Sequence, residues 1–203
     1  IIQFSIPEFE KVGETLDLAS DFVSCGSSDA DFAYFAHFTT PAVVTKLYYD
    51  DVRHLSASYS PTDFKDVQLY SVASFTDDSC FYSMSADMEH LYIVTLGDYG
   101  VPGTVVKIRK VDLVRVDSYV AVRDWWSLER LSAITISGPF LYVVGSSSYV
   151  AKIRTTDMTL ASVSPLFEAS EEELVAVSTD GTNLYVSVAM SGTQRLVRLR
   201  AHD

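Results

Sequence analysis

Basic residues are scarce in this sequence, which has 15 Lys and Arg against 27 Asp and Glu and a formal net charge of −12. A surface of that sign repels a phosphate backbone, so we expect no nucleic-acid partner. Cysteine is scarcer still, and the two residues Cys25 and Cys80 cannot build a disulfide-dense scaffold or, alone, a zinc site. No apolar run approaches the roughly 20 residues of a membrane-spanning helix, so no membrane span is expected.

Catalytic motifs are also missing. The sequence contains no Gly-x-Ser-x-Gly elbow, no phosphate-binding glycine loop and no dinucleotide fingerprint. The histidines lack metal-type spacing and are interpreted as surface or edge residues: His37, His54, His90 and His202. We therefore expect no catalytic residue, no metal and no cofactor, and predict that the protein is not an enzyme. The single Asn183 lies outside any N-glycosylation motif, so any glycan is expected to be O-linked.

An internal repeat is the most informative feature that is present. A Tyr in an apolar segment recurs, each time after one short apolar stretch and before another that carries a basic residue. The Tyr residues are Tyr34, Tyr92, Tyr142 and Tyr185, and the basic residues are Lys46, Lys107, Lys152 and Arg198. An Asp follows each basic residue by five positions, and Gln3 and Glu8 fall in the same frame near the amino terminus. A further alternating stretch completes each unit, at 11–18, 53–60, 115–122 and 160–167.

The periodicity of these stretches predicts strands. Val, Ile, Tyr and Phe alternate with polar residues, Gly, Pro, Asp or Ser mark the breaks, and no segment has a sustained helical period. We therefore predict an all-β chain, a single β-propeller domain over 1–203 with about four repeats of four antiparallel strands, labelled a to d from the channel outwards. The predicted units are a partial c–d unit at 1–20, units at 21–60, 80–123 and 131–167, and a partial a–b–c unit at 174–203, with an insertion at 65–79.

The unequal ends of the repeat leave two arrangements open. In a small closed ring, the first and last strands share a mixed fourth blade and one c strand is left over. In the alternative, the chain is part of a larger propeller or a tandem array. The spare strand favours the second arrangement, because proteins normally cover an exposed strand edge. The strand-like first residues and the missing initiator Met also lead us to expect a segment of something longer.

The stretch Phe32-Ala-Tyr-Phe-Ala-His-Phe-Thr-Thr-Pro41-Ala-Val-Val-Thr-Lys46-Leu resembles the repeat of YVTN- and NHL-like propellers. The variant that it resembles occurs as long tandem arrays in secreted and cell-surface proteins of algae and other protists, and flagellar-hair (mastigoneme) proteins carry similar repeats. The resemblance implies an extracellular or cell-surface location. It implies no catalytic residue, because the matched positions are packing and turn residues.

The repeated residues themselves have structural interpretations. Each Tyr is expected to bury its ring between blades and to hydrogen-bond a backbone group through its hydroxyl. Each basic residue of strand c is expected to pair with the Asp five positions later. Three more Asp residues fall where the a–b hairpin should turn, and turn formation is favoured over calcium binding: Asp29, Asp87 and Asp180. Asp180-Gly181 is a strong hairpin signal.

Aromatic loops supply the candidate interface. Trp125 and Trp126 lie between strand d of one unit and strand a of the next, where exposed Trp favours protein or sugar binding. The 65–79 insertion lies in the equivalent loop one unit earlier, with Phe64 directly before it and Tyr70 and Phe75 within it. We predict that the two loops form one raised surface. In the alternative, the Trp rings only cover the blade core.

The two cysteines are candidates for a disulfide if the protein is extracellular. Cys25 and Cys80 lie in or just before the innermost strands of successive units, which should be neighbours. Cys25 precedes its Tyr by nine residues and Cys80 by twelve. Because the two cysteines stand at different positions along their strands, their Cα atoms can lie beyond the roughly 7 Å limit for bridging. A disulfide and two free thiols therefore both stay open.

The leading functional hypothesis is an extracellular structural protein whose propeller repeats associate with copies of themselves, or with the continuation of the same chain, to build a surface fibre or scaffold. Open blade edges and aromatic loops would carry the association. The alternative is a propeller module that binds a glycan or a partner protein. A lactonase-like propeller hydrolase is disfavoured, because the acidic residues are scattered at turns.

Overall fold

The computed structural model describes residues 2–4, 11–14, 23–48, 71–75, 80–97, 101–121, 130–146, 148–166, 173–190 and 193–201. Every regular element in these ranges is a β-strand. Strand pairing is antiparallel throughout, as the alternating sequence pattern predicts. The all-β prediction is therefore confirmed for the described part of the chain.

The strands form four blades and one separate hairpin. Blade one contains β3 (Val23–Ser28), β4 (Phe32–His37), β5 (Ala42–Tyr48) and β6 (Ser71–Phe75). Blade two contains β7 (Phe81–Ala86), β8 (His90–Thr95), β9 (Thr104–Arg109) and β10 (Val114–Val120), and blade three contains β11 (Leu131–Ser137), β12 (Phe140–Gly145), β13 (Tyr149–Arg154) and β14 (Leu160–Pro165). Blade four has β15 (Glu173–Thr179), β16 (Asn183–Met190) and β17 (Thr193–Arg200), and the hairpin has β1 (Ile2–Phe4) and β2 (Lys11–Glu14).

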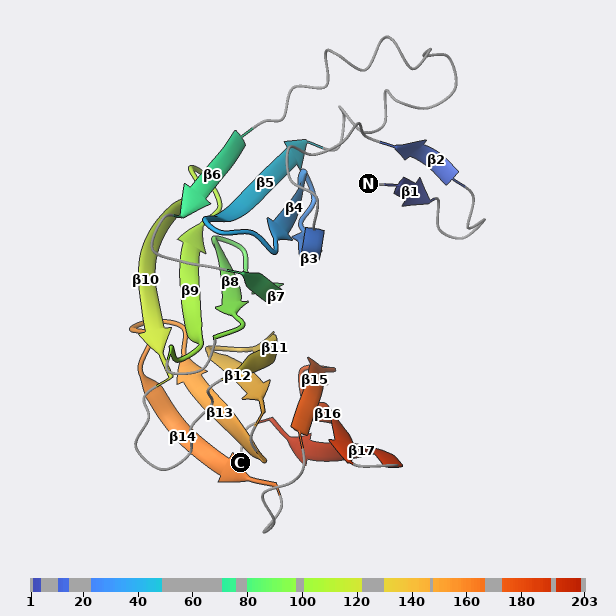
Figure 1. Ribbon diagram of the computed structural model, residues 1–203, viewed down its shortest axis with the longest axis vertical. Helices are drawn as coiled ribbons and strands as arrows, with labels where there is room; N and C mark the ends of the chain where they lie inside the picture. The colour runs from blue at the N-terminus through green and yellow to red at the C-terminus, as the bar shows by residue number, and fades with distance from the viewer. Residues whose placement is uncertain are drawn as a thin grey trace.

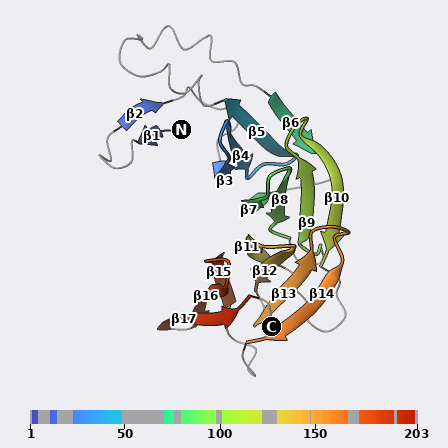
Figure 2. The same cartoon turned by 180° about the vertical axis from the view of Figure 1, so that it is seen from behind.

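The blades are arranged radially, as in a β-propeller. The first strands β3, β7, β11 and β15 line the concave side of an arc, and the outer strands β6, β10 and β14 lie on its convex side (Figures 1 and 2). Inner strands of successive blades are neighbours. The predicted propeller is thus confirmed, and the predicted order of a c–d hairpin, three complete units and a final a–b–c unit matches the observed sheets.

One predicted boundary is wrong. The outer strand of the first complete unit was expected within 53–60, with 65–79 as an insertion after it. Ser71–Phe75 instead forms β6 and pairs with β5 from Ala42↔Phe75 to Lys46↔Ser71. The prediction assumed the short c–d turn of the other units, whereas more than 20 residues separate the two strands here. Residues 53–60 lie outside the described part.

The hydrophobic core is divided between the blades. Each of three buried clusters combines strands b and c of one blade with the strands of the next. Tyr34 and Val44 of blade one, for example, pack with Phe81 and Leu91 of blade two. Each blade therefore has two distinct faces. We call the face toward the next blade in the chain its forward face and the opposite one its backward face.

Every inner strand carries a β-bulge at the same place. The register shifts between Val23 and Cys25 in β3, and at the equivalent positions of β7, β11 and β15. The extra residue in each case is Ser24, Tyr82, Ser132 or Val175. Such bulges turn a side chain away from the regular ladder. Ser24 uses this position to donate a hydrogen bond to the Phe81 carbonyl of the next blade at 2.6 Å, and Ser132 does the same to the Leu174 carbonyl.

Candidate functional site

The turns between strands a and b hold a repeated Asp–Tyr pair. Asp29 follows β3, and its Oδ1 accepts hydrogen bonds from the backbone N–H groups of Phe32 at 2.9 Å and Asp31 at 3.1 Å. The Tyr34 hydroxyl donates to Asp29 Oδ2 at 3.0 Å. The carboxylate therefore closes the turn and also receives the buried Tyr of strand b. Turn formation by this Asp was predicted from the sequence.

The same arrangement recurs in blades two and four. The hydroxyl groups donate from Tyr92 to Asp87 at 2.7 Å and from Tyr185 to Asp180 at 2.8 Å. Gly181 after Asp180 has φ +89, which confirms the predicted tight hairpin. The prediction of a backbone partner for each Tyr is therefore wrong in these three blades. A side-chain carboxylate five residues earlier takes that role, because the a–b turn brings it over the strand b ring.

Blade three departs from this pattern. Ser137 stands where the other blades have Asp, and its hydroxyl donates to the Gly181 carbonyl of blade four at 3.2 Å. The Tyr142 hydroxyl is buried and has no hydrogen-bond partner among the described residues. Burial raises the pKa of Tyr142, so it carries its proton at neutral pH. A polar group left in this state costs stability.

The basic residues of strand c connect successive blades. Lys46 Nζ donates to the Lys110 carbonyl of blade two at 2.8 Å, and Lys107 Nζ donates to the Thr155 carbonyl of blade three at 2.7 Å. The predicted pairing of Lys107 with Asp112 is wrong, because Asp112 instead binds Arg109 at 2.7 Å. Strand c points the lysine toward the forward face, whereas the c–d turn holds its Asp beside the strand end.

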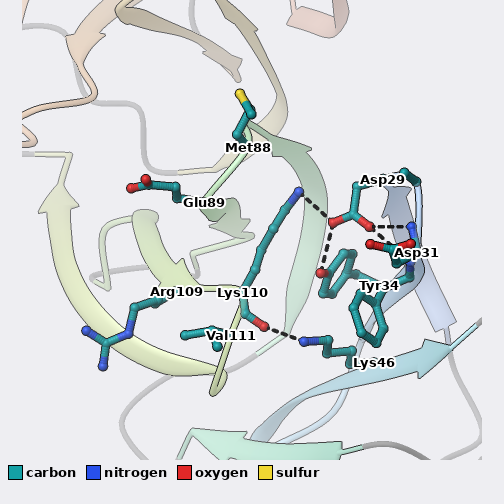
Figure 3. Close-up of a pocket in the computed structure, with 11 residues that line it drawn as sticks. Asp29, Asp31, Tyr34, Lys46, Met88, Glu89, Arg109, Lys110 and Val111 are labelled. Atoms are coloured by element: carbon teal, nitrogen blue, oxygen red, sulfur yellow. Dashed lines mark hydrogen bonds and ion pairs between the residues drawn. The ribbon is translucent and has the colours of Figure 1, made fainter.

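A cavity of about 650 Å³ lies on this side of the molecule, between blades one and two. Figure 3 shows Lys110 reaching from blade two toward Asp29, while the Lys110 carbonyl accepts the Lys46 hydrogen bond. Lys110 Nζ lies 3.1 Å from Asp29 Oδ2, and its side chain is only 7% exposed. Met88 and Val111 are exposed at the rim. The inner charged groups thus bind one another across the blade junction.

The electrostatics of the cavity follow from these contacts. Burial raises the pKa of Asp29, but hydrogen bonds from the Phe32 backbone, Lys110 and Tyr34 outweigh it and hold the pKa below its usual range. Burial also lowers the pKa of Lys46. The inner groups are held by one another and by backbone atoms, and these contacts favour a structural junction.

The opposite side of the molecule has a different character. Strand a of each blade begins on this side. The side therefore holds the bulges, the b–c loops and the connections between blades. Val23, Ser24, Phe38 and Tyr82 line a hollow of about 420 Å³. Tyr82 is 43% exposed and meets the Phe38 ring edge-on, with 6.3 Å between centroids. Sequence reasoning missed Tyr82, although it replaces a Ser at the bulge position, which is the signal that could have identified it.

The predicted aromatic interface falls largely outside the described residues. Trp125, Trp126, Phe64 and Tyr70 all lie in undescribed segments. Phe75 is the last residue of β6, opposite Ala42, and its side chain is not described. The single raised surface stays a prediction.

The predicted disulfide is not formed, since Cys25 and Cys80 are free thiols. The repeat frame places Cys25 opposite Ser83 in blade two, three residues beyond Cys80, or roughly 10 Å along a strand. Burial raises the pKa of the Cys25 thiol to about 11. The cysteines therefore do not link blades one and two.

One histidine prediction is also wrong. His37 is buried, and its Nε2 lies 2.9 Å from Thr45 Oγ1 on the neighbouring strand. Burial lowers the pKa of His37, which favours its neutral form. His90 lies partly exposed beside Asp87 at 3.6 Å, and His54 and His202 lie outside the described part.

Metal and membrane features were also considered for the described ranges. No group of three or more His, Cys, Asp or Glu side chains there has a geometry suited to a metal ion. The described segments include no helix with the length and apolar character needed to cross a bilayer.

No protein-family model and no curated protein sequence matches the chain. Solved structures do. The chain is similar to the crystal structure of RRP9 WD40 repeats, with TM-score 0.66 and 10% identity over 98% of this chain and 56% of that one. It is also similar to BamB from Moraxella catarrhalis (TM-score 0.59, 10% identity, 93% of this chain and 48% of that one). The computationally designed Ika4 protein matches with TM-score 0.61 and 8% identity over 94% of this chain and 98% of that one.

These similarities show a β-propeller fold at low sequence identity. The chain spans about half the length of the RRP9 and BamB structures.

Proposed function

We propose that this chain is a protein-interaction propeller of the YVTN/NHL-like type, which associates with copies of itself or with neighbouring repeats in an extracellular scaffold. The protein acts by assembly and has no catalytic role or cofactor. The described blade junctions support the assembly role, because side chains of one blade bind groups of the next, as Lys46 does with the Lys110 carbonyl and Lys110 with Asp29. The resemblance of the blade-one repeat to cell-surface propeller arrays supports the extracellular location.

The observation that carries the proposal is the open edge of blade four. Among the described residues, β17 pairs with β16 alone, whereas the third strand of every other blade pairs on both sides. Eight residues of main chain are thus available at one edge. A strand of this length and regularity is a template for pairing with another strand. The β1–β2 hairpin is likewise a two-stranded unit that lies at the other end of the arc (Figure 1).

Sedimentation velocity over a range of concentrations, combined with residue-resolved amide hydrogen exchange, tests this function. We expect self-association that rises with concentration and slows exchange at least about tenfold at alternate residues of Thr193–Arg200. Alternate positions are expected because every second amide of an antiparallel edge strand points outward. A chain that stays monomeric, or that associates while these amides stay unprotected, would contradict edge pairing.

A second function, partner or glycan binding, is favoured by the hollow around Tyr82. An exposed aromatic ring on a propeller face is a common anchor for proteins and sugars. Tyr82→Ser removes the ring and matches the Ser found at this bulge in blades one and three. On an oligosaccharide array, binding by the wild-type chain that is lost in Tyr82→Ser would support this function. Equal binding by both chains, or none by the wild type, would count against the glycan form.

A further inference from the structure

The strand b Tyr has the same place and direction in the first three blades. Each Tyr pairs with the residue of strand a that lies two positions before the a–b turn residue: Ser27, Ser85 and Thr135. The strand c ammonium lies 5.8, 5.9 and 5.8 Å from the ring centroids of Tyr34, Tyr92 and Tyr142. In blades one and two the hydroxyl reaches an Asp carboxylate at 3.0 and 2.7 Å. The Tyr142 hydroxyl is therefore directed to the equivalent place beside Ser137.

The side chains around this hydroxyl are smaller than their equivalents. Ser137 has a shorter side chain than Asp and no carboxylate, and its hydroxyl donates to the Gly181 carbonyl at 3.2 Å. In blade four, Ala201 stands where blades two and three have Lys110 and Thr155, since the backbone N–H of each donates to a carbonyl in the a–b turn of its own blade. Tyr142 is 3% exposed, so its hydroxyl is a buried donor without an acceptor among the described residues.

The charge near this hydroxyl is positive. Lys152 lies opposite Tyr142 in the strand register and is half-buried. The described contacts of its ammonium are with two rings, 4.4 Å from the Phe140 centroid and 5.8 Å from that of Tyr142. Burial alone raises the pKa of Tyr142, whereas burial and the Asp87 carboxylate both raise the pKa of Tyr92. No described carboxylate thus acts on the Tyr142 hydroxyl. A buried hydrogen-bond donor beside a cation is suited to an anion.

We propose that the turn end of the junction between blades three and four is a binding site for a small monovalent anion, which accepts a hydrogen bond from the Tyr142 hydroxyl beside the Lys152 ammonium. The ligand has at most the size of a carboxylate group, as chloride and formate do, because an Asp carboxylate holds this place in the other three blades. The anion supplies the acceptor that Ser137 does not. This site lies within one chain and goes beyond the proposed assembly function.

The depth of the site allows exchange with solvent. The side chains of Asp29 and Asp87, which mark the same depth in blades one and two, are 31% and 33% exposed. Gly138 and Pro139 of the blade-three turn and Gly181 of the facing turn are exposed. An anion beside Tyr142 is therefore covered by turn residues and not by the blade core. Because it binds the folded chain, it should stabilise that state increasingly as its concentration rises.

Thermal melting by circular dichroism tests the site. Sodium chloride is titrated against sodium gluconate at constant ionic strength, because gluconate is too large for a place of carboxylate size, and the titration is repeated with formate. We expect the melting temperature to rise with chloride and with formate, as for a single binding equilibrium on the folded chain. A melting temperature that is the same in all three salts would overturn the inference.

Tyr142→Phe removes the donor and leaves the ring in place. It should raise the dissociation constant for chloride at least about tenfold, the effect of one hydrogen bond to a charged group, while melting like the wild type in gluconate. Tyr92→Phe is the matched control and should keep the wild-type dissociation constant, because the hydroxyl that it removes already binds Asp87. Equal chloride dependence in the wild type and in Tyr142→Phe would place the ion elsewhere and contradict the assignment.

Ser137→Asp supplies the acceptor within the chain. The new carboxylate should occupy the place of the anion, so this variant should melt higher than the wild type in gluconate and gain nothing from chloride or formate. Bromide, located by its anomalous X-ray scattering in a crystal of the wild-type chain, gives the position independently of any variant. A peak within hydrogen-bond distance of the Tyr142 hydroxyl is expected, and bromide bound only at other places would overturn the site.

Discussion

At the junction between blades one and two, the polar side chains beside the a–b turn are hydrogen-bonded or ion-paired. At the junction between blades three and four, one buried hydroxyl beside the equivalent turn has no described partner. In the first, Asp29 holds Tyr34 and Lys110 together, and Lys46 donates across the junction. In the second, Ser137 replaces the Asp and leaves the Tyr142 hydroxyl buried without a described partner. Both junctions have comparable apolar cores. The difference therefore isolates what the Asp contributes beyond hydrophobic packing.

Removing the carboxylate from the first junction should have the largest effect. Asp29→Ala leaves the nearly buried Lys110 ammonium and the Tyr34 hydroxyl unpaired and uncaps the turn. We expect the free energy of unfolding to fall by about 3 kcal/mol, at the lower end for a broken buried ion pair because Asp29 is partly exposed. Ser137→Ala, which removes one hydrogen bond to Gly181, should cost about 1 kcal/mol. Urea denaturation checks both, and equal losses would contradict the comparison.

Lowering the pH should separate the turns closed by Asp from the turn of blade three, which has Ser137 instead. The pKa values of Asp29, Asp87 and Asp180 all lie below the usual range. Their contribution to stability is present above the unfolded-state pKa of about 3.9 and is lost as the pH falls through the folded-state values. Ser137 contributes nothing to this loss. Urea titrations should show stability falling steeply below about pH 4, and less steeply in Asp87→Asn.

Buried His37 acts in a different pH window. Burial lowers its pKa, so its neutral form is favoured in the folded state, and stability falls as the pH drops below the unfolded-state value of about 6.5. His37→Gln should remove that earlier slope and leave the steeper one below pH 4. A single slope across both windows in the wild type would show that the two effects are not separable.

The smallest expected change in stability comes from removing a single Tyr hydroxyl in blade two or blade three. Tyr92→Phe removes a hydrogen bond to Asp87 and should cost about 1 kcal/mol, whereas Tyr142→Phe removes an unpaired buried hydroxyl and should be near neutral. In a Ser137→Asp background, Tyr142→Phe should become costly by about 1 kcal/mol, because the new carboxylate accepts its hydrogen bond. A double-mutant cycle with no coupling between positions 137 and 142 would contradict the assigned role.

Several site features were predictable because they are local in the chain. Asp180-Gly181 predicts its own turn, and the Asp five residues before Tyr34, Tyr92 and Tyr185 was correctly assigned to the hairpin. The partner of the Tyr hydroxyl was missed, although both residues were named, because the strand register decides which groups face one another. The burial of His37 was missed for a related reason, since a lone histidine in a strand does not show which face the sheet covers.

Long-range placement was harder to predict. The outer strand β6 follows a long connection, and no local pattern distinguishes Ser71–Phe75 from the alternating stretch before it. The same limit applies to Tyr82, which becomes exposed only because a bulge turns it out of the ladder.

The strand content, the repeat and the propeller arrangement follow from local sequence pattern, because period-two alternation and turn residues act over a few positions and recur in every unit. Only the tertiary structure decided which groups meet across the junctions: Lys46 with a carbonyl of blade two, Asp29 with Lys110, and Tyr142 with no described partner. These contacts join residues far apart in the chain, so they depend on how two blades pack and not on the pattern within either one.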